Sequence, residues 1–173
     1  SVVWQQITAR AGLRPGHLLL CIADHPAIAK HVLSRLRLEL GERLDRRVAT
    51  PCDVLFVVDF PLLEETESGQ LTYMHMPFVA PLEEDIVLLS TDPHRVRATH
   101  YDLVVNGVEF GSGSLRNHRA DVQLKILEIL GYSAAQARER FGFMLDALDA
   151  GAPPHGGFAF GVDRFCLMLA GGD

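Results

Sequence analysis

The sequence contains no apolar run long enough to cross a membrane and no surplus of basic residues. Its 173 residues include 16 Lys and Arg against 22 Asp and Glu, a formal net charge of −6. A membrane-spanning helix needs about 20 consecutive apolar residues, and a domain that binds nucleic acid by itself usually carries a basic surplus. We therefore expect no membrane contact, and any nucleic acid to be held mostly by segments outside this chain. We likewise expect no signal peptide before Ser1.

Cysteine is also scarce. The three cysteines, Cys21, Cys52 and Cys166, form an odd number and show no C-x-x-C spacing. This excludes a disulfide framework or a zinc site of the usual spacing. Because Cys21 and Cys166 lie within apolar runs, we expect reduced, buried thiols in a cytoplasmic protein.

Internal repeats, low-complexity segments, a P-loop and a Ser–His–Asp pattern are all absent. Predicted strands dominate the middle of the chain and predicted helices its end, without regular alternation of strand and helix. This order favours an α+β fold, with a mainly antiparallel sheet flanked by helices.

The first 44 residues form a predicted α/β module without chemistry of its own. An apolar run over 18–23 predicts a buried strand, and Pro26 opens a predicted helix. His17, His25 and His31 share no ligand spacing, so we expect them at the surface. The charged stretch 43–51 predicts the boundary with a second domain, 45–173. The abrupt apolar start suggests a piece of a longer protein.

Residues 101–113 predict a β-hairpin. Asn106-Gly107 between two apolar runs is typical of a two-residue type I′ turn. With that turn, Val105 pairs with Val108, Val104 with Glu109, and Leu103 with Phe110. Alternation then places two carboxylates, Asp102 and Glu109, on one face together with Gly111 and Gly113.

Two carboxylates on a face cleared by glycine suit a hydrated Mg²⁺ shared with phosphate oxygens. An ordinary solvated sheet face is the alternative. We call the face that carries Asp102 and Glu109 the floor. Simple alternation places Arg116 on the other face of the sheet, so Arg116 lies on the floor only if the strand bulges near Gly113. The segment 71–81, fixed by two prolines, has the polar and aromatic mixture of a loop that lines a site.

Helices follow the hairpin. An apolar stripe over 122–130 ends at Gly131, and Ser133 with Gln136 predicts a capping box for the next helix. We expect both helices to cover one side of the sheet. Residues 156–169 then predict a short strand, a glycine turn and a helix with Arg164 in its first turn. Small residues and a helix N-terminus suit a phosphate group, although tight strand–helix packing explains the same glycines.

Four segments, in order, together resemble the bacterial-type aspartyl-tRNA synthetases, which are class II aminoacyl-tRNA synthetases. They are DFP at 59–61, HMPF at 75–78, YDLVVNGVEFGSGSLR at 101–116 and GAPPHGGFAFGVDR at 151–164. The resemblance covers essentially the whole chain. It implies that residues 1–44 end a small inserted domain, and that 45–173 are the C-terminal half of the catalytic domain.

The resemblance also implies roles for single residues. Arg164 would stack on adenine and reach the terminal phosphate of ATP, in a pocket shaped by Gly161, Val162 and Asp163. Glu109, assisted by Asp102, would bind ATP through Mg²⁺. Arg116 would clamp the side-chain carboxylate of L-aspartate, and His75 would close over the amino acid. The product, aspartyl-adenylate, would then be transferred to tRNA by an enzyme that is a homodimer in its full-length form.

Two positions depart from the family pattern. Met76 stands where the family commonly has a second histidine, and a thioether cannot donate a hydrogen bond. Ser112 interrupts the usual three glycines, and we expect it to face the core.

The family's anticodon-binding domain, its dimer motif and its Phe-Arg-x-acid motif are absent from these residues. We therefore expect the isolated chain to be inactive. Two other interpretations stay open: a short paralogue that binds ATP or regulates, and a relative that handles asparagine.

Overall fold

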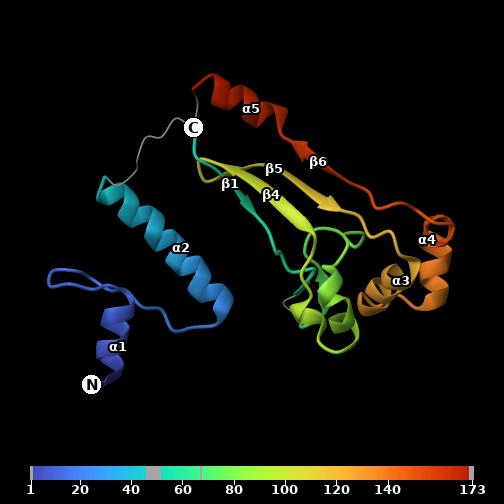
Figure 1. The fold of residues 1–173 in the computed structure, drawn as a ribbon, viewed down its shortest axis with the longest axis horizontal. Coiled ribbons are helices and arrows are strands. Elements are labelled where there is room, and N and C mark those ends of the chain that lie inside the picture. Colours follow the sequence, from blue (N-terminus) through green and yellow to red (C-terminus); the bar gives the residue numbers. More distant parts are fainter. Residues whose placement is uncertain (1, 46–51, 67, 172–173) are drawn as a thin grey trace. The chain divides into compact units, whose positions relative to one another are not determined.

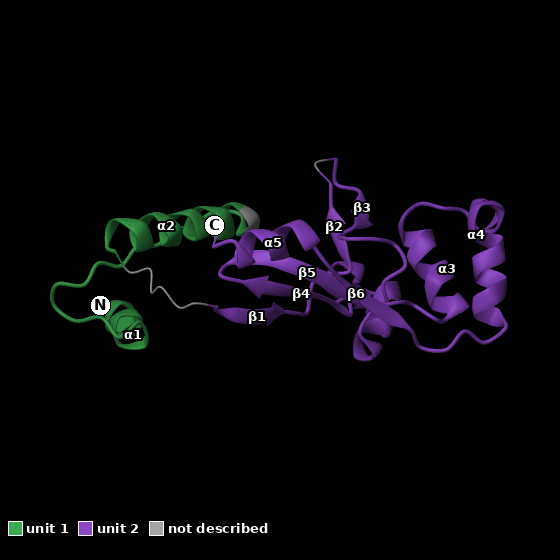
Figure 2. Cartoon of the chain, turned by 90° about the horizontal axis from the view of Figure 1, so that it is seen from above, with its two compact units in different colours: residues 1–50 green, residues 51–173 purple. Residues whose placement is uncertain are grey.

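The computed structural model describes residues 2–45, 52–66 and 68–171. The chain divides into two compact units, residues 1–50 and 51–173 (Figure 2). The predicted boundary at 43–51 and the terminal residues 1, 172 and 173 lie wholly or largely outside the described residues.

The first unit contains two helices, α1 (Val2–Arg10) and α2 (Pro26–Arg43). Pro26 occupies the first turn of α2 as predicted, and Asp24 accepts a hydrogen bond from the backbone N–H of His25. The predicted strand over 18–23 is wrong, because these residues are not in regular structure. A strand requires a hydrogen-bonded neighbour, and the described residues supply none for this run. His17, His25 and His31 are exposed, as expected.

The second unit is built on a four-stranded antiparallel sheet with strand order β1-β4-β5-β6 (Figure 1). Its strands are β1 (Val54–Val57), β4 (His100–Val105), β5 (Val108–Leu115) and β6 (Gly156–Phe160). The α+β prediction is confirmed. β1 ends at Val57, and two residues later Asp59 adopts a positive φ of 60°, which departs from extended backbone.

The β4–β5 hairpin has the predicted turn. Asn106 and Gly107 both have positive φ, 51° and 81°, and Val105 pairs with Val108 and Val104 with Glu109. The next predicted pair is wrong: Leu103 lies opposite Gly111, because a β-bulge leaves Phe110 as the extra residue. The bulge that Arg116 requires therefore exists, but it lies at Phe110 rather than near Gly113.

A hydrophobic core lies beside this sheet. The short hairpin β2 (Leu63–Glu65) and β3 (Leu71–Tyr73) and two 3₁₀ segments, η1 (Glu83–Ser90) and η2 (Pro93–Arg95), surround it together with α3 (Ala120–Ile129). Its buried members are Leu62, Leu63, Val79, Leu89, Val96, Ala98, Val122 and Ile126. The predicted loop 71–81 thus begins with a strand, and residues 74–81, here named the histidine loop, follow it.

Helices α3 and α4 (Ala134–Asp149) pack against each other. Ser133 and Gln136 form the predicted capping box at the start of α4. The expectation that both helices cover a side of the sheet is wrong: they lie beyond the ends of β5 and β6 (Figures 1 and 2). The apolar stripe of α3 packs instead into the hydrophobic core, and the helix contacts η1.

The chain ends in the predicted strand, turn and helix: β6, Gly161 and α5 (Val162–Leu169). Every residue of β6 is exposed, and so are most residues of α5. The prediction of buried cysteines is accordingly wrong. Cys21, Cys52 and Cys166 are free but exposed, because the apolar runs around them have no covering layer in this chain.

Candidate active site

The bulge at Phe110 determines which side chains share a face of the sheet. Directly paired residues point to the same side. Val104 pairs with Glu109 and Asp102 with Ser112, so both carboxylates lie on one face, as predicted. By the same alternation, Arg116 falls on this face one residue beyond the end of β5.

The small residues of this floor are not the predicted ones. Gly111 and Gly113 lie on the opposite face, where a Cβ on Gly111 would meet the Phe158 ring at 2.7 Å. The carboxylate face is lined instead by Ser112 and, on β6, by Gly157 and Ala159. Ser112 therefore faces the floor rather than the core, because the bulge shifts the alternation by one residue.

A cluster of rings occupies the floor beside β1. His100, the first residue of β4, stacks on His75 of the histidine loop, with ring centroids 3.5 Å apart and planes 13° apart. Phe60 meets both rings edge to face, at 5.1 Å for His75 and 4.9 Å for His100. His100 Nε2 lies 2.9 Å from Asp102 Oδ1, and since a carboxylate oxygen accepts, the imidazole N–H donates.

The protonation of His75 is tuned by this cluster. Burial of the stacked ring face lowers the pKa of His75 below its usual range, and repulsion from His100 lowers it further. The negative charges of Asp102 and Glu109 act in the opposite direction and partly offset this lowering of the pKa. The net lowering favours a neutral imidazole at pH 7.

Glu109 and Arg164 meet at the hairpin end of the floor. Arg164 Nη1 lies 3.8 Å from Glu109 Oε1 and also donates to the backbone carbonyl of Glu109. Both side chains are about half exposed, at 52% each. Gly161, at the N-cap of α5, donates its N–H to the Phe110 carbonyl, which ties this helix start to the bulge. The structure thus brings together Glu109 and Arg164, two of the residues to which the resemblance gives a role in binding ATP.

Arg116 lies at the other end of β5. Its backbone N–H donates to the His155 carbonyl at 2.8 Å, and its guanidinium donates to the Met76 sulfur. The half-buried Arg116 borders a hollow of about 370 Å³, which is also lined by Met76, Gln123, Met144 and His155. Among the described residues, no acidic side chain forms an ion pair with Arg116.

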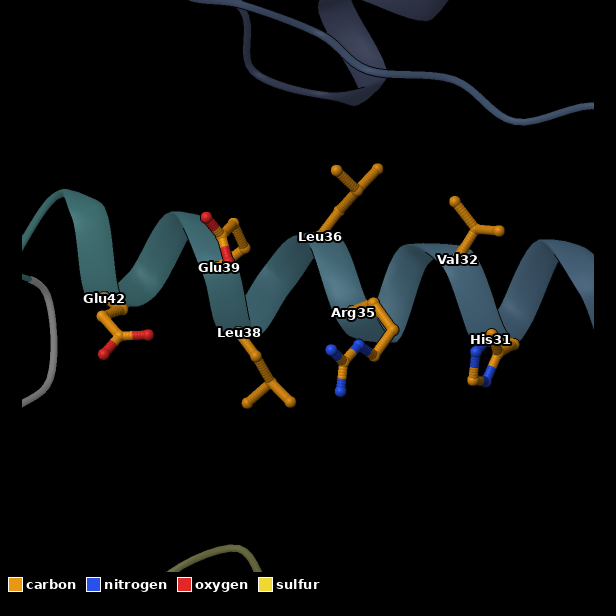
Figure 3. Close-up of a pocket in the computed structure, with 7 residues that line it drawn as sticks. All are labelled: His31, Val32, Arg35, Leu36, Leu38, Glu39 and Glu42. Carbon is orange, nitrogen blue, oxygen red and sulfur yellow. The ribbon is translucent and has the colours of Figure 1, made fainter.

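A larger hollow, about 590 Å³, lies along α2. All of its lining residues belong to that one helix, as Figure 3 shows. A single helix surface provides no opposing wall, so this hollow is not a candidate binding cavity.

The donor set fits a phosphate-bound metal better than an all-protein metal site. Within 2–45, 52–66 and 68–171, no three His, Cys, Asp or Glu side chains are grouped to enclose an ion. Mg²⁺ typically takes one or two carboxylates and completes its shell with water and phosphate oxygens. Glu109, half exposed, suits that role. Asp102 is mostly buried and has one oxygen engaged by His100, which leaves the other for a ligand.

Two residues of this site escaped the sequence analysis. His100 precedes the recognisable hairpin motif, and Phe60 belongs to the DFP segment at 59–61, for which the resemblance implied no single-residue role. The sequence contained one weak indication: once the turn is placed at 106–107, alternation along the strand puts His100 on the same face as Asp102. The partner of His100 in the histidine loop is distant in sequence, so no spacing rule connects them.

Comparison with known proteins places this geometry in a family. The profile of the class II tRNA synthetases (D, K and N) matches residues 33–173. The chain belongs to this family.

Individual relatives indicate which members of the family the chain is similar to. The chain is 48% identical, over 95% of its length, to "Aspartate--tRNA(Asp/Asn) ligase" of Moorella thermoacetica. It is 47% identical, over 99% of its length, to "Aspartate--tRNA ligase" of Phocaeicola vulgatus. It spans only 28% and 30% of these two relatives. Among the aspartyl and asparaginyl members of the family, the chain is thus similar to bacterial aspartate–tRNA ligases, and it corresponds to under a third of each.

Solved structures agree on the fold. The aspartyl-tRNA synthetase of Entamoeba histolytica has a TM-score of 0.51 at 19% identity, covering 98% of this chain and 28% of that one. The asparaginyl-tRNA synthetase of the same organism, bound to asparaginyl-adenylate, has a TM-score of 0.50 at 17% identity, covering 96% of this chain and 30% of that one. None of the described helices has the length and apolar content that crossing a bilayer requires.

Proposed function

We propose that this chain is the C-terminal part of the catalytic domain of an aspartate–tRNA ligase, preceded by the end of an inserted domain at residues 1–44. The full-length enzyme activates L-aspartate with ATP and transfers the aspartyl group to tRNA. Two bacterial ligases about 47% identical to nearly the whole chain support this assignment. A cytoplasmic, homodimeric enzyme is part of the same proposal.

One observation carries the choice of substrate: the half-buried guanidinium of Arg116 has no acidic partner among the described residues and borders a hollow. An unpaired cation in such a place favours a ligand carboxylate, which a guanidinium holds through two parallel hydrogen bonds. The aspartate side chain supplies that group. The thioether of Met76 is a weak acceptor, so the substrate displaces it at little cost.

ATP binds at the opposite end of the floor. Arg164 leaves the Glu109 backbone to lie on the adenine face and to reach the terminal phosphate, and Gly161, Val162 and Asp163 shape the pocket at the start of α5. Glu109, with Asp102, would hold Mg²⁺, and the bound ion would supply positive charge that offsets the charge of the phosphates. His75 closes over the amino acid from the histidine loop.

In the reaction, the aspartate α-carboxylate attacks the α-phosphate. An oxygen–phosphorus bond forms, and the bond to pyrophosphate breaks. The residues of this chain orient the two substrates and neutralise charge, which is how enzymes accelerate such displacements without a protein nucleophile. The ribose hydroxyl at the 3′ end of tRNA then attacks the aspartyl carbonyl and AMP leaves.

The test is aspartate-dependent ATP–pyrophosphate exchange by the full-length ligase carrying Arg116→Leu. We expect kcat/KM for aspartate to fall by about 10- to 100-fold or more, the equivalent of a lost charge-assisted hydrogen bond. Arg138→Leu, on the exposed face of α4, is the matched control and should leave exchange unchanged. If Arg116→Leu retained aspartate activation, the assigned role of Arg116 would be wrong.

The coding sequence beyond this segment separates the ligase from a short regulatory paralogue. An upstream anticodon-binding domain and a Phe-Arg-x-acid motif in the same reading frame would support the ligase. A stop codon shortly before Ser1 would support the paralogue.

A further inference from the structure

The His100 side chain contacts two parts of the site: His75 of the histidine loop and Asp102 on β4. It is buried, with 8% of its surface exposed. Its ring edge bonds Asp102 through Nε2 at 2.9 Å, and its ring face carries the stacked His75 at 3.5 Å between centroids. Phe60 packs edge to face on both rings and closes the cluster.

The two contacts use different chemistry and different parts of the ring. The hydrogen bond to Asp102 requires a donor at the Nε2 position and no aromatic face. The stack on His75 requires a flat ring and no donor. A single substitution can therefore remove either contact and leave the other.

We propose that His100 is a positioning residue that couples the histidine loop to the Asp102 carboxylate. One oxygen of Asp102 is held by the imidazole, so its other oxygen has a fixed direction. The ring face provides the surface on which His75 rests when the loop closes over the amino acid. This inference depends on the proposed function, since it assigns Asp102 to the ATP side and His75 to the aspartate side.

Two variants in the full-length ligase test the coupling. His100→Phe keeps the ring and removes the donor, and it should raise KM for ATP by about 10-fold with KM for aspartate within about twofold, because a hydrogen bond to a charged group is lost. His100→Gln keeps a donor at about the same distance from the backbone and removes the ring. It should raise KM for aspartate several-fold and leave KM for ATP within about twofold.

His94→Gln and His94→Phe, at an exposed histidine of η2, are the matched controls and should change neither constant. A purely structural role for His100 would move both constants together with the thermal midpoint. That result would overturn the inference, and so would two variants indistinguishable from wild type.

A second readout does not depend on catalysis. In NMR spectra of the 173-residue chain, the His75 ring protons should be shifted upfield by the stacked ring of His100. The shift should persist in His100→Phe and disappear in His100→Gln. An unchanged His75 signal in His100→Gln overturns the inference even if the ligase is active. A wild-type ligase without exchange, but with the expected NMR shifts, would contradict the proposed function while supporting the stack.

Discussion

Single residues at the floor are arranged in contacting pairs. Arg164 rests on Glu109, Arg116 on Met76, and His100 on Asp102. Under the proposed function, each cation or donor is thus held near the position from which it would contact substrate. Such preorganisation lowers the entropy that binding must overcome.

Glu109→Gln tests the ATP end of the floor. An amide is neutral and a poor ligand for Mg²⁺, so this variant should bind Mg-ATP at least about 10-fold more weakly, as measured by calorimetry on the full-length ligase. Glu128→Gln, an exposed carboxylate that pairs with Lys125 on α3, is the control. Equal affinity in Glu109→Gln and wild type would remove Glu109 from the ATP site.

At the scale of elements, the approach of β6 to β5 depends on Gly111. A Cβ there would lie 2.7 Å from the Ala159 carbonyl oxygen and 2.8 Å from the Phe160 Cβ, both too close to be tolerated without movement of the strand. Gly111→Ala should therefore lower the free energy of unfolding by about 1–3 kcal/mol, the usual cost of overpacking. Gly142→Ala, where a Cβ meets nothing within 4 Å on α4, should be neutral or stabilising. Chemical denaturation of both variants checks this, and equal losses would contradict it.

The ion pair between η1 and the segment before β4 predicts a pH dependence. Arg97 bonds both carboxylate oxygens of Asp85, at 2.7 and 3.0 Å, and holds the pKa of that carboxyl below its usual range. A lowered native pKa means that the contribution to stability is complete above the unfolded value of about 3.9 and is lost as the pH falls through the lower native value. Asp85→Asn should lose this contribution, so its urea midpoint should fall less than that of wild type between about pH 5 and 2. Parallel curves for the two proteins would contradict the assignment.

The hairpin shows how far the sequence determines such elements. Asn106-Gly107 specifies its turn, because both residues tolerate positive φ. The bulge at Phe110 has no comparable local signal, and the rings that Phe110 contacts, Phe160 and Phe165, are at least 50 residues away in the sequence. Because this bulge was not predicted, Gly111 was expected on the carboxylate face and Ser112 on the opposite face, and the structure shows the reverse. The shared face of Asp102 and Glu109 was predicted correctly because β4 alternates without interruption from Asp102 to Val104, and Glu109, which pairs with Val104, lies between the turn and the bulge.

At the scale of the whole molecule, burial was predicted least well. The apolar run around Cys166 predicted burial, yet Cys166 is exposed, and the apolar residues Phe56, Phe160 and Leu169 of β1, β6 and α5 are exposed by 61%, 52% and 68%. Hydrophobicity predicts that a surface is covered but not which segment covers it. Because the chain spans under a third of its bacterial relatives, we infer that the remainder of the ligase covers these faces.

A pair of variants tests this inference. Ile126 is fully buried in the core, so Ile126→Ala should destabilise both the isolated chain and the full-length ligase by about 2–5 kcal/mol. Phe143 is 83% exposed, so Phe143→Ala should change the stability of the isolated chain by less than about 0.5 kcal/mol. A larger loss in the full-length ligase would identify Phe143 as part of a surface that the remainder covers. Equal small losses of stability in both proteins would contradict the inference that the remainder of the ligase covers Phe143.

The most direct test of the proposed function is ATP–pyrophosphate exchange by the wild-type full-length protein, with aspartate and asparagine compared as substrates and the isolated 173-residue chain assayed beside it. We predict exchange that depends on aspartate, at least about 100-fold lower kcat/KM with asparagine because the Arg116 guanidinium meets an amide instead of a carboxylate, and no exchange by the isolated chain. Exchange that prefers asparagine, or none with either amino acid, would contradict the assignment.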